Sequence, residues 1–398
     1  MIVPERTAAP RTGDTPVRVA ADRVVDAAGR PGFWETLGST PLVGAAVVHA
    51  GRTVHPTTFV ARVPADHEVM VHVNSLTDRH RTRIEPALLE RVPGTDVGHL
   101  TYLLPPELVA SYRLVTLPRV PRDAGESRAG WFGIHRAGRP DPHCPETLVH
   151  PHGESSSVLR MPAAPSHPAW AAARAGRPAP RSAARRAAVV DGRDVVVLTT
   201  GPAARVLVLF DGPLWEAAGL VDALAHRDPG LAVVAVDNGT GEARADLLPH
   251  PDRVGTFVEH VRDTLGGTVP ALRDPATVSA AGVSFGGLAS AGLAVTRPDL
   301  VGSAVVLSAS FQFRAGEEMR RDSARPGDLA ESLETRPTGA RLHVMVGAEE
   351  DMLATQARQF ADRAVAAGGD VTFEVRSGGH DFAWWSDALF DGLERLGV

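Results

Sequence analysis

The sequence predicts an α/β protein in which a mostly parallel central sheet follows a small N-terminal β-sandwich domain. After about residue 190, short continuous apolar runs alternate with longer stretches of helical period, which is typical of strands buried on both faces. Between about residues 35 and 115, short runs of β-like sequence are separated by turn formers. The length of 398 residues also favours two domains over one.

Differences in composition and periodicity divide the chain into four segments. Residues 1–30 are polar and aperiodic and are expected to fray, and residues 31–120 are expected to form the β-sandwich. Residues 121–190 are rich in Pro, Gly, Ala and Arg, so we expect an extended connector there. Residues 191–398 form the expected α/β domain. Its predicted strands are 195–198, 206–210, 231–236, 278–282, 304–307, 342–346 and 371–375, and helical period marks 214–226, 254–265 and 355–367.

The composition narrows the classes of function. All 41 positively charged residues are arginines, which argues against Walker-type phosphate loops and against Schiff-base or pyridoxal phosphate enzymes, because each needs a lysine. The net charge of -6 gives no reason to expect nucleic acid as a partner. Cys144 is the only cysteine, and no apolar run could span a membrane or act as a secretory signal. We therefore expect a cytoplasmic protein with neither a nucleic-acid nor a membrane partner.

Ser284 is the predicted nucleophile. It follows the strand expected at 278–282 and precedes a helical stretch, and this strand-turn-helix context gives weight to a Gly-x-Ser-x-Gly match. Gly282 and Gly286 are small where such a tight turn needs small residues, and the N–H of Phe285 could donate to an oxyanion. The alternative is a glycine-rich turn with an incidental serine. The flanking elements favour the nucleophile and, with it, the α/β-hydrolase fold.

His380 is the predicted general base. A serine hydroxyl needs a base, and in this fold the order along the chain is Ser, acid, His. Only His343 and His380 follow Ser284. His343 lies inside an expected strand and is predicted to be structural, whereas His380 sits in a glycine-containing loop near the C-terminus.

The acid is expected after the strand 342–346, where Glu349, Glu350 and Asp351 follow one another. Asp351 could instead cap the next helix, and Glu349 could be solvated. Spacing alone does not choose among the three carboxylates.

A second oxyanion donor is expected near Gly212, in the loop after the strand 206–210. Trp215 could form a wall of the site. The alternative is an ordinary strand-to-helix turn with Pro213 at the first helical position, and the spacing favours neither reading.

The whole pattern resembles the enterochelin (enterobactin) esterases and their siderophore-esterase relatives over most of the chain after about residue 30. The N-terminal matches are a strand and Thr-Asp-Arg-His turn at 71–80, a turn at 92–97, Asp141-Pro142 and the stretch 161–165. The later matches are Asp211-Gly212 with Trp215, Arg244 with Asp246-Leu247, the stretch 284–288, Ser308-Ala309-Ser310 and the stretch 378–381.

This resemblance implies an N-terminal β domain that leans on an α/β-hydrolase, and the hydrolysis of lactone esters in a cyclic catecholate siderophore. It assigns the acid to Glu350 and places Arg244 near an anionic ferric catecholate, with a surface ion pair to Asp246 as the alternative. The aromatic pair that the family often has after its Ser-x-Ser stretch is absent, and Trp384 and Trp385 could supply that surface instead.

The expected activity is therefore that of a serine esterase that opens a ferric siderophore through an acyl-enzyme and releases iron. No metal or organic cofactor is expected, the expected partner is a small ester or lactone, and the sequence does not predict an oligomeric state. One alternative is an acyltransferase or a macrocycle-forming or macrocycle-opening enzyme that acts on a peptide or lactone natural product. Another alternative is a siderophore-binding scaffold without catalysis.

Overall fold

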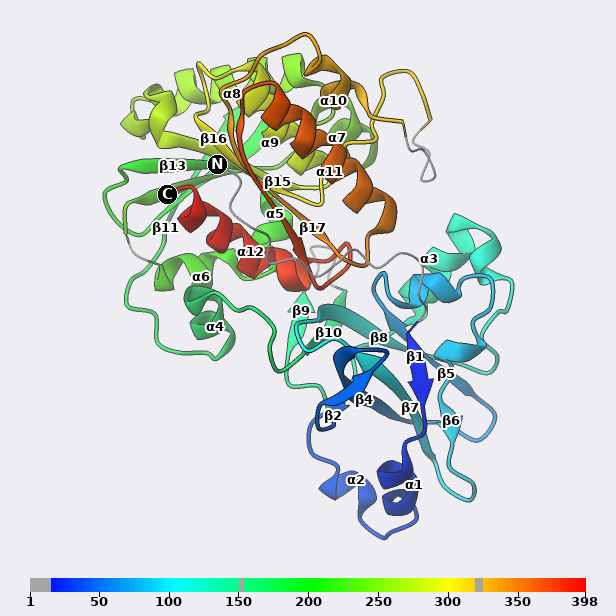
Figure 1. Ribbon diagram of the computed structural model, residues 1–398. Coiled ribbons are helices and arrows are strands. Elements are labelled where there is room, and N and C mark those ends of the chain that lie inside the picture. The colour runs from blue at the N-terminus through cyan, green and yellow to red at the C-terminus, as the bar shows by residue number, and fades with distance from the viewer. Residues whose placement is uncertain (1–15, 150–153, 228, 319–324) are drawn as a thin grey trace. The chain divides into compact units, whose positions relative to one another are not determined.

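The computed structural model describes residues 16–149, 154–227, 229–318 and 325–398 (Figure 1). The chain forms two compact units. The N-terminal unit contains the described residues up to Pro165 together with the later segment Ser377–Trp384, and the C-terminal unit contains Ser166–Arg376 and Trp385–Val398. Among the described residues, no helix is long and apolar enough to cross a membrane.

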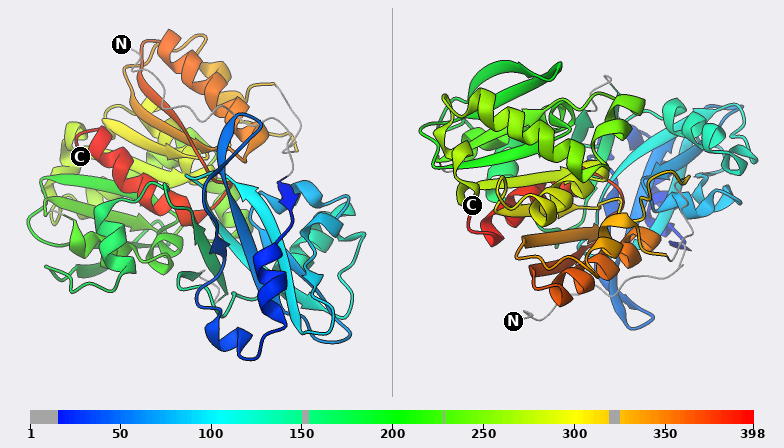
Figure 2. Two further views of the ribbon diagram at one scale, coloured as in Figure 1. Left: turned by 60° about the horizontal axis from the view of Figure 1, so that its bottom comes forward. Right: turned by 90° about the horizontal axis from the view of Figure 1, so that it is seen from above.

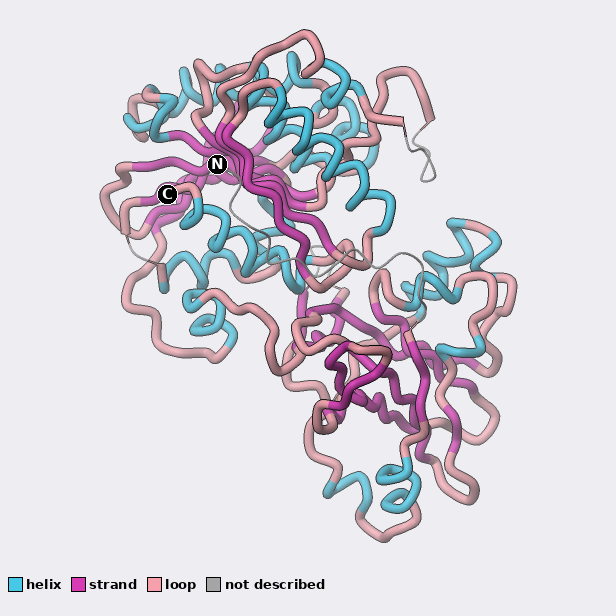
Figure 3. The backbone as a smooth tube through the Cα atoms, in the orientation of Figure 1, coloured by secondary structure: helices cyan, strands magenta, loops and turns pink. Residues whose placement is uncertain are grey.

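The N-terminal unit is a β-sandwich, and its strands are drawn in magenta in Figure 3. Phe59 of one sheet and Tyr112 of the other bring their ring centroids to 5.1 Å in the shared core, so the two sheets pack face to face. All pairings are antiparallel. The first sheet contains β1 (Val17–Val19), β2 (Leu42–Val43), β3 (Val47–His49), β4 (Arg52–Arg62), β6 (Glu90–Arg91) and β7 (Val97–Leu104), and the second contains β5 (Glu68–Val73), β8 (Val109–Leu117), β9 (Thr147–Val149) and β10 (Ser155–Arg160).

Three helices accompany these sheets: α1 (Asp22–Ala28), α2 (Phe33–Thr36) and α3 (Arg128–Ala137). The side chain of Ser127 caps α3 by accepting a hydrogen bond from the N–H of Gly130. Trp131 and Ile134 of α3 are buried in a small core with Met70 of β5, so α3 packs against the second sheet.

The structure differs from two of the expected segment boundaries. Within residues 1–30, which were expected to fray, β1 pairs with β7 and α1 packs onto the sandwich, while residues 1–15 lie outside the described part. The expected connector 121–190 contains α3, β9, β10, α4 (Pro168–Arg174) and β11 (Ala184–Val190). β10 was not predicted, because its run of serines is polar. Ser156 and Ser157 are nevertheless buried, where they accept hydrogen bonds from Arg113 and from the N–H of Asp141.

The C-terminal unit is built on one eight-stranded sheet in the order β11-β12-β14-β13-β15-β16-β17-β18. β12 is antiparallel to both of its neighbours, and the strands from β14 to β18 are parallel to one another. Every strand expected after residue 190 is present, which confirms the predicted α/β fold. Their bounds are β12 (Arg193–Thr199), β13 (Arg205–Phe210), β14 (Leu231–Val236), β15 (Val278–Val283), β16 (Ser303–Leu307), β17 (Arg341–Gly347) and β18 (Asp370–Arg376).

Helices cover both faces of this sheet. Figure 1 shows α8 and α9 on one face and α6 and α12 on the other, and Figure 2 gives two further views of these layers. The helical stretch expected at 214–226 is divided into α5 and α6, because Gly219 adopts φ 99° between them. The helices are α5 (Gly212–Ala217), α6 (Leu220–His226), α7 (Gly241–Leu247), α8 (Pro251–Leu265), α9 (Phe285–Thr296), α10 (Asp328–Ser332), α11 (Asp351–Ala366) and α12 (Phe382–Arg395).

Candidate active site

Ser284 occupies the sharp turn between β15 and α9. Its φ of 57° and ψ of -118° lie outside the regions that residues with a Cβ normally adopt. The turn is so tight that a Cβ placed on Gly282 would lie 2.5 Å from the carbonyl carbon of Gly286. The local structure is therefore the strained strand-to-helix turn that exposes a nucleophile in α/β-hydrolases.

The end of β16 holds this turn in place. The N–H of Ser284 donates to the carbonyl of Leu307 at 3.0 Å, and the carbonyl of Ser284 accepts from the N–H of Ser310 at 3.1 Å. The hydroxyls of Ser284 and Ser310 lie 3.2 Å apart. Ser310 thus contacts the proposed nucleophile through both its backbone and its side chain.

Glu350 follows β17 and is buried. Its Oε2 accepts from the hydroxyl of Ser308 and from the N–H of Gly347, both at 2.6 Å. The same Ser308 hydroxyl accepts from the indole N–H of Trp385 at 2.9 Å. Two short bonds to one oxygen fix the orientation of the carboxylate.

The two neighbouring acids have different surroundings. Asp351 is exposed and is the first residue of α11, but Glu350 occupies the N-cap position and no side-chain capping bond is present there, so the alternative that Asp351 caps this helix was wrong. Glu349 is buried rather than solvated. Among the three, Glu350 is the carboxylate held by the Ser308 hydroxyl.

Phe285 and Gly212 are each the first residue of a helix, α9 and α5. The first N–H groups of a helix have no partner within it and carry a partial positive charge. β13 and β15 are adjacent and parallel, with Leu209 opposite Ala281, so their carboxyl ends lie side by side. A Cβ placed on Gly286 would lie only 3.0 Å from Asp211 Oδ2, so the Gly212 loop contacts the serine turn directly.

Arg244 forms its ion pair with Asp211 and not with Asp246. Its Nε and one Nη each donate to the buried Asp211 carboxylate at 2.7 Å. Asp246 pairs with Arg253 instead, so the alternative expectation of an ion pair between Arg244 and Asp246 was wrong. The sequence could not separate these two carboxylates, because Asp211 lies more than thirty positions before Arg244.

The Arg244 guanidinium also contacts the serine turn. One Nη lies 3.4 Å from the carbonyl of Val283, and the guanidinium carbon lies 5.5 Å from the centroid of the Phe285 ring. The Phe285 ring packs edge-on to Phe313 at 5.9 Å. Arg244 therefore links the loop after β13 to the turn after β15.

Trp215, Trp384 and Trp385, the tryptophans predicted to contact substrate, are buried, which corrects their interpretation. Trp215 is fully buried, and its indole N–H donates to the carbonyl of Phe210 at 3.1 Å. The indole of Trp384 donates to the carbonyl of Gly379 at 2.6 Å. Large aromatic side chains next to tight turns pack under those turns, and their hydrogen bonds fix the backbone there.

His380 lies between β18 and α12, in the segment Ser377–Trp384 that belongs to the N-terminal unit. Its backbone N–H donates to the hydroxyl of Ser75 at 3.0 Å, and its carbonyl accepts from the side-chain amide of Asn74 at 3.0 Å. The other candidate, His343, is buried inside β17 with Nε2 3.4 Å from Glu374 Oε2. His343 is structural, as predicted.

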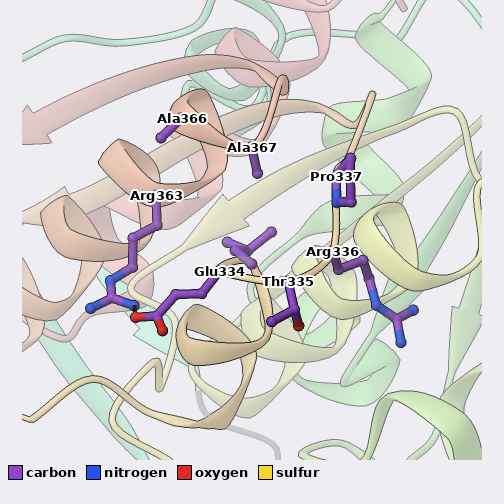
Figure 4. Close-up of a pocket in the computed structure, with 8 residues that line it drawn as sticks. Glu334, Thr335, Arg336, Pro337, Arg363, Ala366 and Ala367 are labelled. Carbon is purple, nitrogen blue, oxygen red and sulfur yellow. Dashed lines mark hydrogen bonds and ion pairs between the residues drawn. The ribbon is translucent and has the colours of Figure 1, made fainter.

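Two hollows on the C-terminal unit lie away from these strand ends. One, of about 390 Å³, is lined by residues that precede β17 and by the end of α11, and Figure 4 shows Arg363 reaching toward Glu334 across it. The other, of about 490 Å³, is lined partly by residues that precede β13 and β14. Both lie at the amino ends of the strands, whereas Ser284 and Glu350 lie at the carboxyl ends. Within the described part of the chain, no group of three or more His, Cys, Asp or Glu side chains is arranged to hold a metal ion.

Comparison with known proteins decides the family. Residues 57–170 match the family model described as "Enterochelin esterase, N-terminal", and residues 198–396 match the one described as "Putative esterase". An iron(III) enterobactin esterase from Dickeya dadantii is 31% identical, with 93% of each chain covered. The chain belongs to the enterochelin esterase family. The resemblance read from the sequence is thereby confirmed, and this family member is a carboxylic ester hydrolase.

Further relatives agree with this membership. An iron(III) salmochelin esterase from Escherichia coli O6:H1 is 27% identical, covering 92% of this chain and 93% of its own. The crystal structure of a ferric enterobactin esterase from Salmonella typhimurium has a TM-score of 0.79 at 22% identity and covers 92% of this chain and 99% of that one. An enterobactin esterase from Shigella flexneri, solved in the presence of enterobactin, has a TM-score of 0.75 at 21% identity and covers 92% and 98%. These structures share the fold of the esterase described here.

Sequence reasoning missed several members of the site. Ser308 and Ser310 were noted as a motif without a role, and Asp211 was noted only beside Gly212. Their contacts depend on which strands are adjacent: β16 lies between β15 and β17, so the two serines that follow β16 reach Ser284 and Glu350.

Proposed function

We propose that this esterase hydrolyses the ester (lactone) bonds of a catecholate-type ferric siderophore and so releases its iron. The observation that carries the proposal is the 31% identity to an iron(III) enterobactin esterase across 93% of both chains. The strained turn at Ser284 supports it, because this conformation is costly and serves to present a nucleophile.

The proposed nucleophile is Ser284, the proposed base is His380, and the proposed acid is Glu350. His380 takes the proton of the Ser284 hydroxyl while its oxygen attacks an ester carbonyl of the substrate. Glu350 keeps the imidazole in the required tautomer and stabilises the imidazolium that forms. The bonds from Ser308 and Gly347 support this role, because they keep the carboxylate oriented.

The negative charge of the tetrahedral intermediate needs fixed donors. The N–H of Phe285, and a donor at Gly212, are proposed to hold it, because both lie at helix starts on adjacent strand ends. Arg244 is proposed to fix these two loops against each other. Since Asp211 binds two of its three guanidinium nitrogens, Arg244 offers at most the remaining nitrogen to an anionic substrate.

The reaction is completed by three further proton transfers, from His380 to the leaving alkoxide, from water to His380, and from His380 back to the Ser284 oxygen. His380 gives the proton to the leaving alkoxide, and the opened lactone remains attached to Ser284 as an ester. Water activated by His380 then attacks this acyl-enzyme, which releases a linear carboxylic acid and regenerates the serine hydroxyl. Opening the ring weakens the preorganised iron chelator, so the iron is released from the product.

A hydrolysis panel tests the proposal. Ferric and iron-free catecholate trilactones are incubated with the enzyme and with the Ser284→Ala variant, with and without an added amine, and the products are identified by mass spectrometry. We expect linear acids from wild type and none from the variant. Indifference to every catecholate lactone would overturn the siderophore assignment, and amide or cyclised products in place of acids would indicate acyl transfer.

A further inference from the structure

We infer that the N-terminal unit positions the catalytic base, with Asn74 and Ser75 as positioning residues for His380. This inference rests on the proposed role of His380 as base. It adds a task for the N-terminal unit that does not involve contact with the substrate.

Both polar backbone groups of His380 are held by adjacent side chains. The Ser75 hydroxyl accepts from the His380 N–H at 3.0 Å, and the Asn74 side-chain amide donates to the His380 carbonyl at 3.0 Å. The peptide planes on either side of a residue determine its φ and ψ. Fixing both planes therefore fixes the direction in which the imidazole leaves the backbone.

The residues around His380 are tied to β8 in the same unit. The N–H of Val109 donates to the carbonyl of Ser377 at 3.1 Å, and the N–H of Ser111 donates to Asp381 Oδ2 at 2.5 Å. Ser111 also accepts from the N–H of Asn74 at 2.9 Å, directly after β5 ends. The N–H and C=O of Ser111 point to the same side of β8. The C=O meets Asn74, just after β5, and the N–H meets Asp381, so the segment around His380 lies beside β8 where β5 has ended.

The glycines before His380 fit this close approach. A Cβ placed on Gly379 would lie 2.2 Å from both Cβ and Oγ of Ser75. A Cβ on Gly378 would lie 2.6 Å from Cδ1 of Trp384 and 3.0 Å from the carbonyl of Val109. The Gly-Gly-His-Asp sequence is thus explained by contacts with the N-terminal unit and not by loop flexibility.

Ser75 adopts an unusual backbone conformation to make its contact. Its φ is 61°, a left-handed value that few residues other than Gly, Asn and Asp adopt. A hydrogen bond from the N–H of Leu76 to the carbonyl of Asn74, at 2.7 Å, closes the turn. Strained residues of this kind cluster where geometry serves function, which favours positioning over simple packing.

Two variants remove the contacts without disturbing the fold. Ser75→Gly removes the hydroxyl and accepts the positive φ, and Asn74→Asp keeps the shape but removes the donor. Thr77→Val is the matched control, because it removes a buried bond to the carbonyl of Val73, at 2.9 Å in the same turn, that does not involve His380. Thermal unfolding checks that each variant is folded.

The readouts are hydrolysis of a small p-nitrophenyl ester and the rate of fluorophosphonate labelling of Ser284 between pH 5 and 9. We expect kcat in Ser75→Gly and Asn74→Asp to fall roughly 10- to 100-fold with KM little changed, because a misplacement of about 1 Å can cost about 100-fold in rate. The rise of the labelling rate with pH should weaken in both variants, and Thr77→Val should behave as wild type.

His380→Ala, assayed alongside, separates the two possible failures. If His380→Ala labels and hydrolyses at the wild-type rate, the proposed base is wrong. If His380→Ala is inactive while both Ser75→Gly and Asn74→Asp keep the wild-type rate and pH profile, the positioning role alone is overturned.

Discussion

Ser284, the proposed nucleophile, has a strained backbone conformation. A φ of 57° with a ψ of -118° costs on the order of 1–3 kcal/mol for a residue with a Cβ. The hydrogen bonds from Ser284 to Leu307 and from Ser310 to Ser284 hold the residue there. The strain is therefore maintained by β16, the neighbouring strand.

Replacing Ser284 by Gly and by Ala should separate strain from chemistry. Both variants are expected to lose at least about 1,000-fold in kcat/KM, because the nucleophile is gone. Ser284→Gly should nevertheless unfold with a free energy about 1 kcal/mol higher than Ser284→Ala, since only glycine relieves the backbone strain. Urea titrations of both variants measure this difference, and equal stabilities would show that the turn is not strained.

The surroundings of Glu350 favour it over its two neighbours as the triad acid. Glu350→Gln keeps the size of the side chain but cannot stabilise an imidazolium, so we expect kcat/KM to fall about 100-fold or more. Asp351→Asn, at an exposed helix start one residue later, should change kcat/KM less than about twofold and stability by less than about 1 kcal/mol. Hydrolysis rates of the two variants decide the assignment, and the reverse result would transfer the role to Asp351.

At the scale of the secondary-structure elements, the proposed catalytic groups Ser284 and Glu350 follow the carboxyl ends of β15 and β17. The loop after β13 and the turn after β15 are joined by the pair of Arg244 with Asp211, whose side chains are 21% and 3% exposed. A buried bidentate pair fixes geometry as well as charge. Arg244 thus adds to the pairing of β13 with β15 in fixing α5 relative to α9.

Arg244→Lys keeps the charge but cannot form two parallel bonds to Asp211. We expect kcat/KM to fall roughly 10-fold and the free energy of unfolding to fall by about 1–2 kcal/mol. Arg253→Lys is the matched control, because Arg253 pairs with Asp246 on the surface and exposed pairs contribute about 0–1 kcal/mol. Equal effects of the two substitutions would show that Arg244 has no special role.

In the N-terminal unit, the turn after β5 contains a carboxylate that should make stability depend on pH. Burial alone would raise the pKa of Asp78, but His72, whose Nε2 lies 3.6 Å away, together with Arg81 and the indole of Trp131, holds that pKa below its ordinary 3.8. A lowered pKa stabilises the folded state above pH 3.8, and this contribution is lost as the pH falls through the lower folded-state pKa.

Asp78→Asn should therefore destabilise the N-terminal unit by about 1–2 kcal/mol at pH 7. Below the folded-state pKa of Asp78 the difference between wild type and variant should shrink, because the wild-type carboxyl is then also uncharged. Urea unfolding followed by tryptophan fluorescence at pH 7 and in the acid range measures this, and a difference independent of pH would contradict the account.

At the scale of the whole molecule, the sequence predicted the strands and helices better than it predicted which residues they contact. The continuous apolar strands of the parallel sheet were evident, because strands buried on both faces need apolar residues throughout. β10 was missed, because its buried serines satisfy buried polar groups and so look like a loop. β11 was missed because it is a largely exposed edge strand rich in Ala and Arg.

In the candidate site, too, single residues could be predicted from the sequence but contacts between distant residues could not. Ser284 and His380 could be proposed from motif and chain order, and Glu350 needed a family resemblance. The contact of Asn74 with His380 joins residues 306 positions apart, and no local pattern encodes such a pair. Contacts of this kind appear only when the strands have been assembled.

We propose that Ser284 opens a catecholate lactone through a covalent acyl-enzyme. Opening a cyclic lactone releases no fragment, so the intermediate should add the full mass of the iron-free lactone to the peptide that contains Ser284. The direct measurement is acid quenching of the enzyme with a ferric catecholate trilactone during the first turnover, followed by peptide mass spectrometry. We expect this adduct on Ser284 before the linear product accumulates, and no adduct in Ser284→Ala. Linear product formed at the wild-type rate by Ser284→Ala, with no adduct in either protein, would contradict it.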